Sequence, residues 1–352
     1  MSQMPEDQAY SPGYVRTSLA GSISLGMEQG RFTRGCGSTC LNVLLNYKEG
    51  CSAKCGYCGL SAARTAGRPK SGADRHTFIR VSWPLYPLES ILSKIGEGRH
   101  QFKRVCVSMV THERAMDDAV AVVNSFALNT GLPVSALLNP TVMDGKKDML
   151  VIKDAGADRV GIAIDAATQP LFSSLRGAGA GGPHTWERYF EALEEAVEVF
   201  GRYKAGIHLI VGLGETEKEM AAIIDECHNM GALTHLFSFY PETGSLLENL
   251  ERPSVGSYRR IQLARYLINE SICTFHDFKF SAAGKIVDFG MDIAPFIEKG
   301  LPFMTSGCPG KDGFPACNRP FSNERPSEPI RNFHFMPNDE DKRDIASQIC
   351  AE

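Results

Sequence analysis

The sequence predicts an α/β fold built as a TIM-type (β/α) barrel, complete or partial, with an extension at each end of the chain. Two observations support this prediction. Short apolar runs with strand character alternate several times with helix-length segments, and strand–helix–strand units of this spacing form parallel sheets. The 352 residues are 43% hydrophobic and 22% charged, so the chain can bury the core of one large barrel.

The alternating elements follow one another through short connections. The predicted strands are residues 104–110, 133–139, 158–165 and 204–211, and the predicted helices are residues 115–126, 146–154, 185–200 and 217–230. The helix of residues 185–200 is strongly amphipathic, and Thr185 stands at its N-cap position. Barrel enzymes place their sites at the C-terminal ends of the strands. The polar residues at those ends are Thr111, His112, Glu113, Asn139, Asp165 and the segment from Gly212 to Glu215.

The chain divides into three predicted parts. Residues 1–45 form an N-terminal arm, residues 46–300 form the barrel, and residues 301–352 form a C-terminal segment. Residues 301–338 are rich in proline, glycine and asparagine and are expected to be an ordered loop segment.

Charge and hydropathy exclude several classes of protein. The net charge of −4 gives no indication of a nucleic-acid or membrane-surface partner. The chain has no run of about 18 apolar residues, so we expect no transmembrane helix. The first ten residues, MSQMPEDQAY, are polar and lack the apolar region of a signal peptide. We therefore expect a cytoplasmic protein.

A group of three cysteines is the clearest chemical signal. The chain has eleven cysteines, which in a reducing cytoplasm indicate metal or redox chemistry more often than disulfides. Cys51, Cys55 and Cys58 form a C-x3-C-x2-C pattern within one loop. Three thiolates on a [4Fe–4S] cluster leave one iron open to another ligand. Tyr57 could pack against a bound purine. The alternative is a zinc site that Cys36 or Cys40 completes.

The three-cysteine loop resembles that of the radical S-adenosylmethionine (SAM) superfamily. The resemblance implies that SAM binds the open iron and is cleaved to methionine and a 5′-deoxyadenosyl radical. Residues 158–165 (DRVGIAID), the helix at Thr185 and residues 206–216 (GIHLIVGLGET) are similar, in the same order, to the biotin synthase branch.

This resemblance also implies a set of SAM contacts. Asp165 would hold the ribose, and Ile210 to Gly212 would flank the adenine. The strand end from Ser108 to Glu113, with His112, would face the methionine amino group, and Asn139 ends the next strand. Arg176 and His184 are the candidates for the methionine carboxylate. The alternatives are an N-cap role for Asp165 and a plain turn at Gly212 and Gly214.

Four further cysteines lie near the two ends of the chain. Cys36 and Cys40 precede the three-cysteine loop, and Cys308 and Cys317 lie in the C-terminal segment. A closed barrel can bring its termini together, so these four thiolates could hold a second, auxiliary [4Fe–4S] cluster. The alternatives are two disulfides or unrelated thiols. Cys106, Cys227 and Cys273 are expected to be buried small hydrophobes.

An auxiliary cluster indicates a function. In biotin synthase and lipoyl synthase such a cluster is the sulfur source, and the tail CPG…CNRPFSNERP resembles the two-protein lipoyl synthase system. We therefore expect sulfur insertion into an octanoyl chain. The implied partners are a low-potential donor (ferredoxin or flavodoxin), an octanoylated lipoyl carrier protein and a second radical SAM subunit. The alternatives are a radical rearrangement or C–C bond enzyme, like methylornithine synthase, and a non-enzymatic iron–sulfur scaffold, which would not need the IVGLGET segment.

Overall fold

One mostly parallel sheet organises the molecule. The computed structural model describes residues 9–65, 77–78, 81–322 and 329–351. In spatial order the strands of the main sheet are β10 (Ala232–Ser238), β9 (Ala205–Val211), β8 (Ala157–Asp165), β7 (Val134–Leu138), β6 (Arg104–Ser108), β2 (Cys40–Leu45), β1 (Tyr14–Thr17) and β5 (Leu85–Pro87). The first six are parallel, whereas β1 pairs antiparallel with both β2 and β5. This confirms the predicted α/β class. The hydrogen-bonded sheet ends at β10 and β5, so it does not close into a complete ring.

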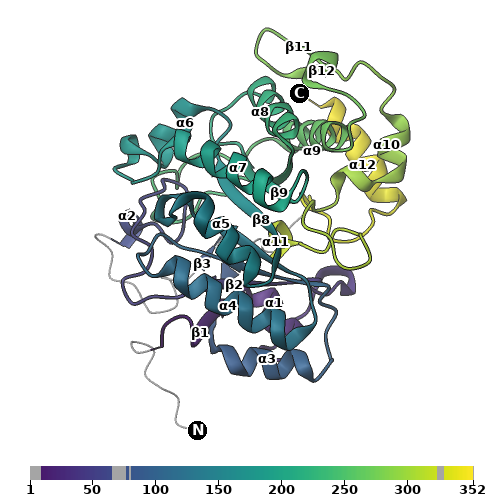
Figure 1. Ribbon diagram of the computed structural model, residues 1–352. Helices are drawn as coiled ribbons and strands as arrows, with labels where there is room; N and C mark the ends of the chain where they lie inside the picture. The colour runs from purple at the N-terminus through teal and green to yellow at the C-terminus, as the bar shows by residue number, and fades with distance from the viewer. Residues whose placement is uncertain (1–8, 66–76, 79–80, 323–328, 352) are drawn as a thin grey trace.

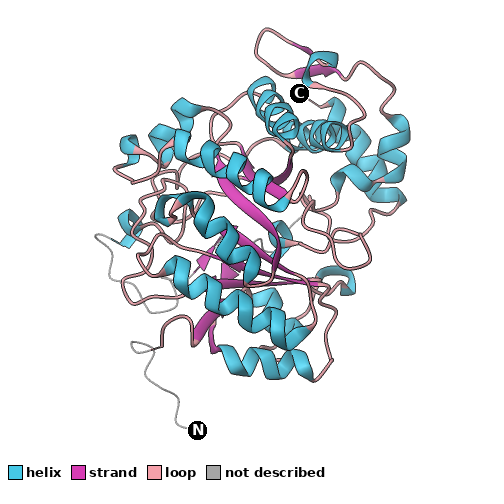
Figure 2. Cartoon of the chain, viewed as in Figure 1, coloured by secondary structure: helices cyan, strands magenta, loops and turns pink. Residues whose placement is uncertain are grey.

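Four long helices connect successive parallel strands, as a (β/α) repeat requires. They are α4 (Ala115–Thr130), α5 (Gly145–Asp154), α7 (Trp186–Phe200) and α8 (Glu217–Met230), and all four match the predicted helices within a few residues. Helices α4, α5 and α7 lie side by side along the sheet, and α8 packs on β10, as Figures 1 and 2 show. A capping box between Thr216 and Glu219 begins α8, and Gly231, with a φ of 99°, ends it in the left-handed region that glycine favours.

The remaining elements are short or lie at the margins. The other helices are α1 (Leu19–Ser24), α2 (Ala62–Thr65), α3 (Leu88–Gly96), α6 (Gln169–Leu175), α9 (Val255–Asn269), α10 (Ala294–Lys299), α11 (Arg319–Ser322) and α12 (Asp339–Cys350). The two-stranded sheets are β3 (Thr77–Phe78) with β4 (Val81–Ser82), and β11 (Lys279–Phe280) with β12 (Ile286–Asp288). None of the described helices has the length and apolar character needed to cross a membrane.

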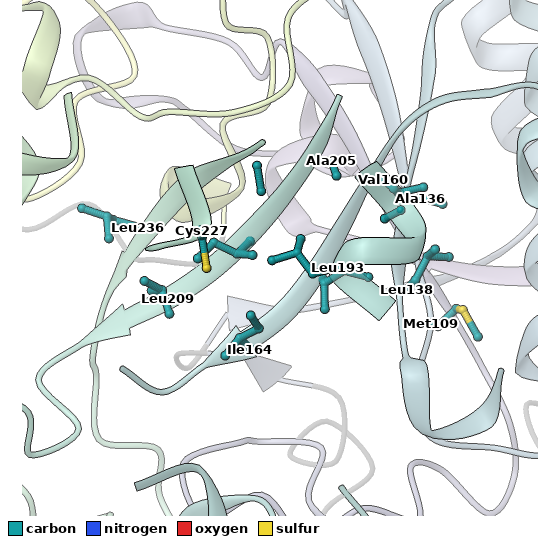
Figure 3. Packing of buried hydrophobic residues seen from close by; sticks show 14 of the residues in the cluster. Met109, Ala136, Leu138, Val160, Ile164, Leu193, Ala205, Leu209, Cys227 and Leu236 are labelled. Atoms are coloured by element: carbon teal, nitrogen blue, oxygen red, sulfur yellow. The ribbon is translucent and has the colours of Figure 1, made fainter. Parts of the chain in front are cut away.

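The two faces of the parallel sheet differ in chemistry. Side chains alternate between faces along each strand. The face toward the helices is apolar: in Figure 3, Leu193 of α7 lies among Ala136, Val160 and Ile164 of the strands. The opposite, inner face carries the side chains at the alternate positions of each strand. On β6 these include the polar residues Arg104 and Ser108. The hydrophobic core therefore lies between sheet and helices, and the inner face is free for chemistry.

The C-terminal segment lies against this inner face. Figure 1 shows α11 near the centre of the molecule, apart from the C-terminal helix α12. Helix α11 contacts both β2 and β10, the first and the last of the parallel strands. The Thr39 hydroxyl donates to the carbonyl of Ala316 at 2.7 Å, which holds the tail beside the start of β2. Strands β1 and β2 themselves fall within the residues assigned to an N-terminal arm, yet they are part of the main sheet.

Candidate active site

The three-cysteine loop follows β2 at the carboxyl end of the parallel strands. Cys55 is buried, and Cys51 and Cys58 are half-buried. The backbone N–H of Thr111 points at the sulfur of Cys51, and that of Leu60 points at the sulfur of Cys58, each at 3.4 Å. Backbone donors of this kind stabilise thiolates on an iron–sulfur cluster.

The three thiols lie close enough to affect one another. Burial raises the pKa of the Cys58 thiol, and the neighbouring Cys55 and Cys51 raise it further. Burial also raises the pKa of Cys55, against the opposing effect of the Arg176 guanidinium. Metal binding at this loop must therefore displace protons. Among the described residues no three Cys, His, Asp or Glu side chains converge on a point that suits one metal ion.

Asp165 lies at the end of β8 and faces the three-cysteine loop. The Tyr57 hydroxyl donates to its carboxylate at 2.5 Å, and the Arg176 guanidinium lies 3.2 Å from the same oxygen. Asp165 does not cap the next helix, because the side chain of Thr168 accepts from the N–H of Leu171 at the start of α6. The Asp165 carboxylate therefore belongs to the candidate active site beside the three-cysteine loop.

A buried hydrogen-bond network runs from Arg176 across the strand ends. Arg176 donates to the Tyr189 hydroxyl at 3.0 Å and to the carbonyl of Ile164 at 2.9 Å. Tyr189 donates to Asn139 at 3.3 Å, and Asn139 donates to the Thr111 hydroxyl at 2.8 Å. Because the N–H of Thr111 meets Cys51, the network connects Asp165 to the cysteine loop.

Arg176 and His184 are the two candidates in this network for binding the methionine carboxylate of SAM. The Nε of Arg176 is buried and has no hydrogen-bond partner among the described residues. His184 contacts Thr141 at 2.6 Å and the Tyr189 hydroxyl at 3.2 Å through Nδ1. Burial, with a smaller effect of Arg176, lowers the pKa of His184 to about 3. His184 is therefore neutral at pH 7, and Arg176 is the one of the two candidates that offers a positive charge.

A cavity of about 170 Å³ opens beside Asp165. Its walls are Tyr57, Cys58, Gly59, Leu137, Ala163, Asp165, His208, Ile210, Phe237, Ser238, Phe239, Tyr240, Glu242 and Arg319. About half of these residues come from β7 to β10, and the rest from the segment that follows β10, the cysteine loop and the tail. The cavity is thus shared by the three-cysteine site, the strand ends and the C-terminal segment.

Comparison with known protein families identifies this arrangement. Residues 45–227, more than half of the chain, match the model of the radical SAM superfamily. The chain belongs to the radical SAM superfamily. The family implies a [4Fe–4S] cluster, SAM and an electron donor. The residues present fit both groups: three thiols, two of which have a backbone N–H donor on the sulfur, and a buried guanidinium with a spare donor.

Several solved structures are similar to this chain. They include methylornithine synthase (PylB), with 16% identity over 70% of this chain and 66% of that one and a TM-score of 0.46. The FeFe-hydrogenase maturase HydG from Carboxydothermus hydrogenoformans shares 16% identity over 63% of this chain and 50% of its own, with a TM-score of 0.45. The methyltransferase TsrM from Kitasatospora setae shares 15% identity over 66% and 43%, with a TM-score of 0.39. The chain thus spans two thirds or less of each of these structures. The curated proteins contain no match.

Several residues assigned to SAM contacts lie outside the cavity of this radical SAM protein. The buried Ser108 hydroxyl accepts from Arg319. His112 stacks on Tyr47 with ring centroids 3.8 Å apart, and Glu113 is exposed. Gly212 is in a turn with a φ of 103°, where its N–H donates to the Glu215 carboxylate at 2.6 Å. Ile210 does line the cavity.

Sequence reasoning missed three residues that complete the site: Thr111 as a network member, Tyr189 and Arg319. The sequence marks Thr111 only as a polar residue at a strand end. Tyr189 lies in the amphipathic helix α7 and reads as a core residue, although its hydroxyl joins Asn139 and Arg176. Arg319 lies in the tail, far along the chain from the cavity that it lines.

A second group of thiols lies deeper in the same interior. Cys40, Cys106 and Cys317 pack together, with Cys308 against them. The structure thus brings together three of the four predicted auxiliary ligands. Cys36 is not among them, because its thiol donates to the carbonyl of Thr33 at 3.0 Å. Cys106 occupies that place instead, although it was expected to be only a small hydrophobe.

Proposed function

We propose that this radical SAM enzyme inserts sulfur into an unactivated C–H bond of an octanoyl chain, as a lipoyl synthase does. The observation that carries the proposal is the position of the two thiol groups. Leu137, His208, Phe237 and Arg319 line both the cavity beside the three-cysteine loop and the cavity beside Cys106, Cys308 and Cys317. A substrate carbon between them would face both sites.

The chemistry comes from the bound groups. SAM on the first cluster would supply the 5′-deoxyadenosyl radical that breaks the substrate C–H bond and takes the hydrogen atom, and an auxiliary cluster would supply the sulfur of the new C–S bond and take up one electron. The protein would position the substrate. Leu137, Ala163, Ile210, Phe237 and Phe239 give the cavity an apolar wall that suits an alkyl chain.

The proposed partners follow from this reaction. A ferredoxin or flavodoxin would reduce the first cluster, and an octanoylated lipoyl carrier protein would deliver the substrate. A second radical SAM subunit would share the two sulfur insertions. The proposed SAM contacts are Asp165 for the ribose, Ile210 for the adenine and Arg176 for the carboxylate.

Product analysis tests the proposal. Anaerobic protein, SAM, a low-potential reductant and an octanoyl-lysyl peptide should give 5′-deoxyadenosine and a thiolated peptide by mass spectrometry. Cys55→Ala removes one of three cluster ligands and should abolish both products. Cys273→Ala, which removes a buried cysteine outside both thiol groups, should retain both.

The opposite result is equally clear. Deoxyadenosine formation without any thiolated peptide, together with an isomerised or C–C-rearranged product from another substrate, would favour a radical rearrangement or C–C bond enzyme. The deeper thiols would then be structural or electron-relaying. Unchanged SAM cleavage in Cys55→Ala would contradict the radical mechanism itself.

A further inference from the structure

Strand register places two cysteines on the inner face of the sheet. Cys40 of β2 pairs with Arg104 of β6, and Asn42 pairs with Cys106. Residues two apart on a strand share a face, so Cys40, Asn42, Arg104 and Cys106 all lie on one side. Figure 1 shows β2 at the centre of the lower half of the molecule, near α11. Both cysteines are buried.

The tail brings two more cysteines to the same place. The N–H of Cys317 donates to the carbonyl of Cys308 at 3.1 Å, which closes a tight loop. A Cβ atom at Gly307 would lie 2.5 Å from the Cβ of Cys317, so only glycine allows this approach. Arg104 donates to the carbonyl of Pro309 at 2.7 Å and anchors the loop on β6.

The four thiols form one group in which Cys106 is central. The side chains of Cys40, Cys106 and Cys317 pack in one cluster, and that of Cys308 packs against it. Cys106 is close enough to interact electrostatically with Cys40, Cys308 and Cys317. Cys106, Cys308 and Cys317 also line one small cavity, together with Ser135, His208 and His235.

The surroundings of the group suit a negatively charged cluster. Four thiolates carry more negative charge than an iron–sulfide core carries positive charge, and buried charge needs compensation. The positive charge of Arg104 favours the thiolate forms of Cys40 and Cys308. The positive charge of Arg319 favours the thiolate forms of Cys106 and Cys317.

His235 offers a further donor at the same cavity. Its ring is buried, and its Nδ1 has no hydrogen-bond partner among the described residues. Gly206 of β9 leaves room for this ring, because a Cβ atom there would lie 2.8 Å from Nε2 of His235. An unpartnered buried nitrogen at the cavity that Cys106, Cys308 and Cys317 line is the kind of group that hydrogen bonds a cluster sulfide.

We propose that Cys40, Cys106, Cys308 and Cys317 are the four protein ligands of an auxiliary iron–sulfur cluster in the interior of the barrel, and that Cys36 is not a ligand. The cluster would then be held by β2, β6 and the tail together. This inference rests on the proposed function only for the role of the cluster as sulfur donor, since the ligand set stands on the packing of the thiols.

Iron content of single variants tests the ligand set. Anaerobically reconstituted wild-type protein should contain about eight irons per chain, and Cys106→Ser should contain about four. Cys36→Ala should keep all of them. Cys227→Ala removes another buried cysteine, on α8 and outside the group, and should also keep about eight. Mössbauer spectra should show that Cys106→Ser retains the cluster of the three-cysteine loop, and deoxyadenosine should still form.

Each other outcome overturns the assignment. Full iron in Cys106→Ser with loss in Cys36→Ala would restore Cys36 as the ligand. A wild-type protein with zinc or a Cys40–Cys317 disulfide at this position would exclude the cluster. The proposed function fails separately: wild-type protein with about eight irons, lost as expected in Cys106→Ser, but with no sulfur in any product, would keep the ligand set and exclude sulfur insertion.

Discussion

Asp165 has a φ of 65°, a conformation that few residues other than glycine adopt. The register of β8 against β9 shifts between Ile162 and Asp165, and this irregularity turns the carboxylate toward Tyr57 and Arg176. Backbone strain of about 1–3 kcal/mol persists only where the surroundings impose it, which is frequent at functional sites. Here the surroundings are a buried guanidinium and a phenol.

Replacing Asp165 by Asn should therefore weaken SAM binding. The neutral amide is a poorer acceptor for ribose hydroxyls, and we expect the Kd for SAM to rise about tenfold, or ~1.4 kcal/mol. Equilibrium binding to anaerobic protein measures this change, and the iron at the three-cysteine loop should stay constant. Tyr57→Phe keeps both ring and carboxylate and should change Kd less. An unaltered Kd in Asp165→Asn would remove Asp165 from the SAM site.

At the residue scale, sequence could predict ligands that are close together but not those that meet across the fold. The close spacing of Cys51, Cys55 and Cys58 predicts a cluster-binding loop. Cys106 was hidden because it stands alone in the sequence. The alternation of β6 did contain a signal, since Arg104, Cys106 and Ser108 share one face while Val105 and Val107 share the other. Only in the folded structure, where Cys40 and Cys317 pack against Cys106, does this face become a candidate site for a metal cluster.

At the scale of elements, the predicted helices and strands agree with the structure because the apolar residues in each segment repeat with a single clear period, that of a helix or that of a strand. The predicted strand of residues 158–165 and helix of residues 217–230 are β8 and α8 almost residue for residue. Strand β2 and the antiparallel β1 were assigned to an arm instead. The sequence does not show which distant strands β1 and β2 pair with, so their place in the sheet depends on tertiary contacts.

A buried ion pair joins α8 and α9. Glu217, the first residue of α8, accepts from Arg260 of α9 at 2.7 Å and from the N–H of Ile286 at 2.8 Å. Arg260 also donates to the carbonyls of Ile349 and Ala351, so it joins α9 to the C-terminus. Both side chains of the pair are more than nine-tenths buried.

Glu217→Ala should destabilise the protein by about 3–5 kcal/mol, because it leaves the Arg260 charge buried without its partner. The shift of the urea unfolding midpoint measures this loss. Glu226→Ala is the control, since Glu226 is an exposed residue of the same helix and its loss should cost less than about 0.5 kcal/mol. Equal effects of the two substitutions would show that the buried pair adds nothing to stability.

At the scale of the whole molecule, buried imidazoles make stability depend on pH. Burial lowers the pKa of both His184 and His235 to about 3, with smaller effects of Arg176 and Arg265 respectively. In the unfolded chain both return to about 6.5. Between pH 3 and 6.5 the unfolded state therefore binds more protons than the folded state. The stabilisation is complete above about pH 6.5 and is lost as the pH falls toward 3.

Lowering the pH from 7.5 to 5.5 should therefore reduce the free energy of unfolding by about 1.4 kcal/mol for each of these two imidazoles. Urea unfolding at the two pH values measures the difference. His184→Gln keeps a polar partner for Thr141 and should show a smaller loss, by about the contribution of one imidazole. A variant with the same pH dependence as wild type would mean that His184 is not held neutral.

The hydrogen bond between Thr39 and Ala316 joins positions 277 residues apart, and this separation sets an order of assembly during synthesis. Cys51, Cys55 and Cys58 leave the ribosome almost together. Cys40 emerges before them, yet at about 5–20 residues per second it waits roughly 15–55 s for Cys317. Until Cys317 emerges, the nascent inner face lacks the tail that covers it. Cys40, and Cys106 once it has been synthesised, are open to oxidants during that time. The part of the barrel interior that holds Cys40, Cys106, Cys308 and Cys317 is thus the last part of the enzyme to mature.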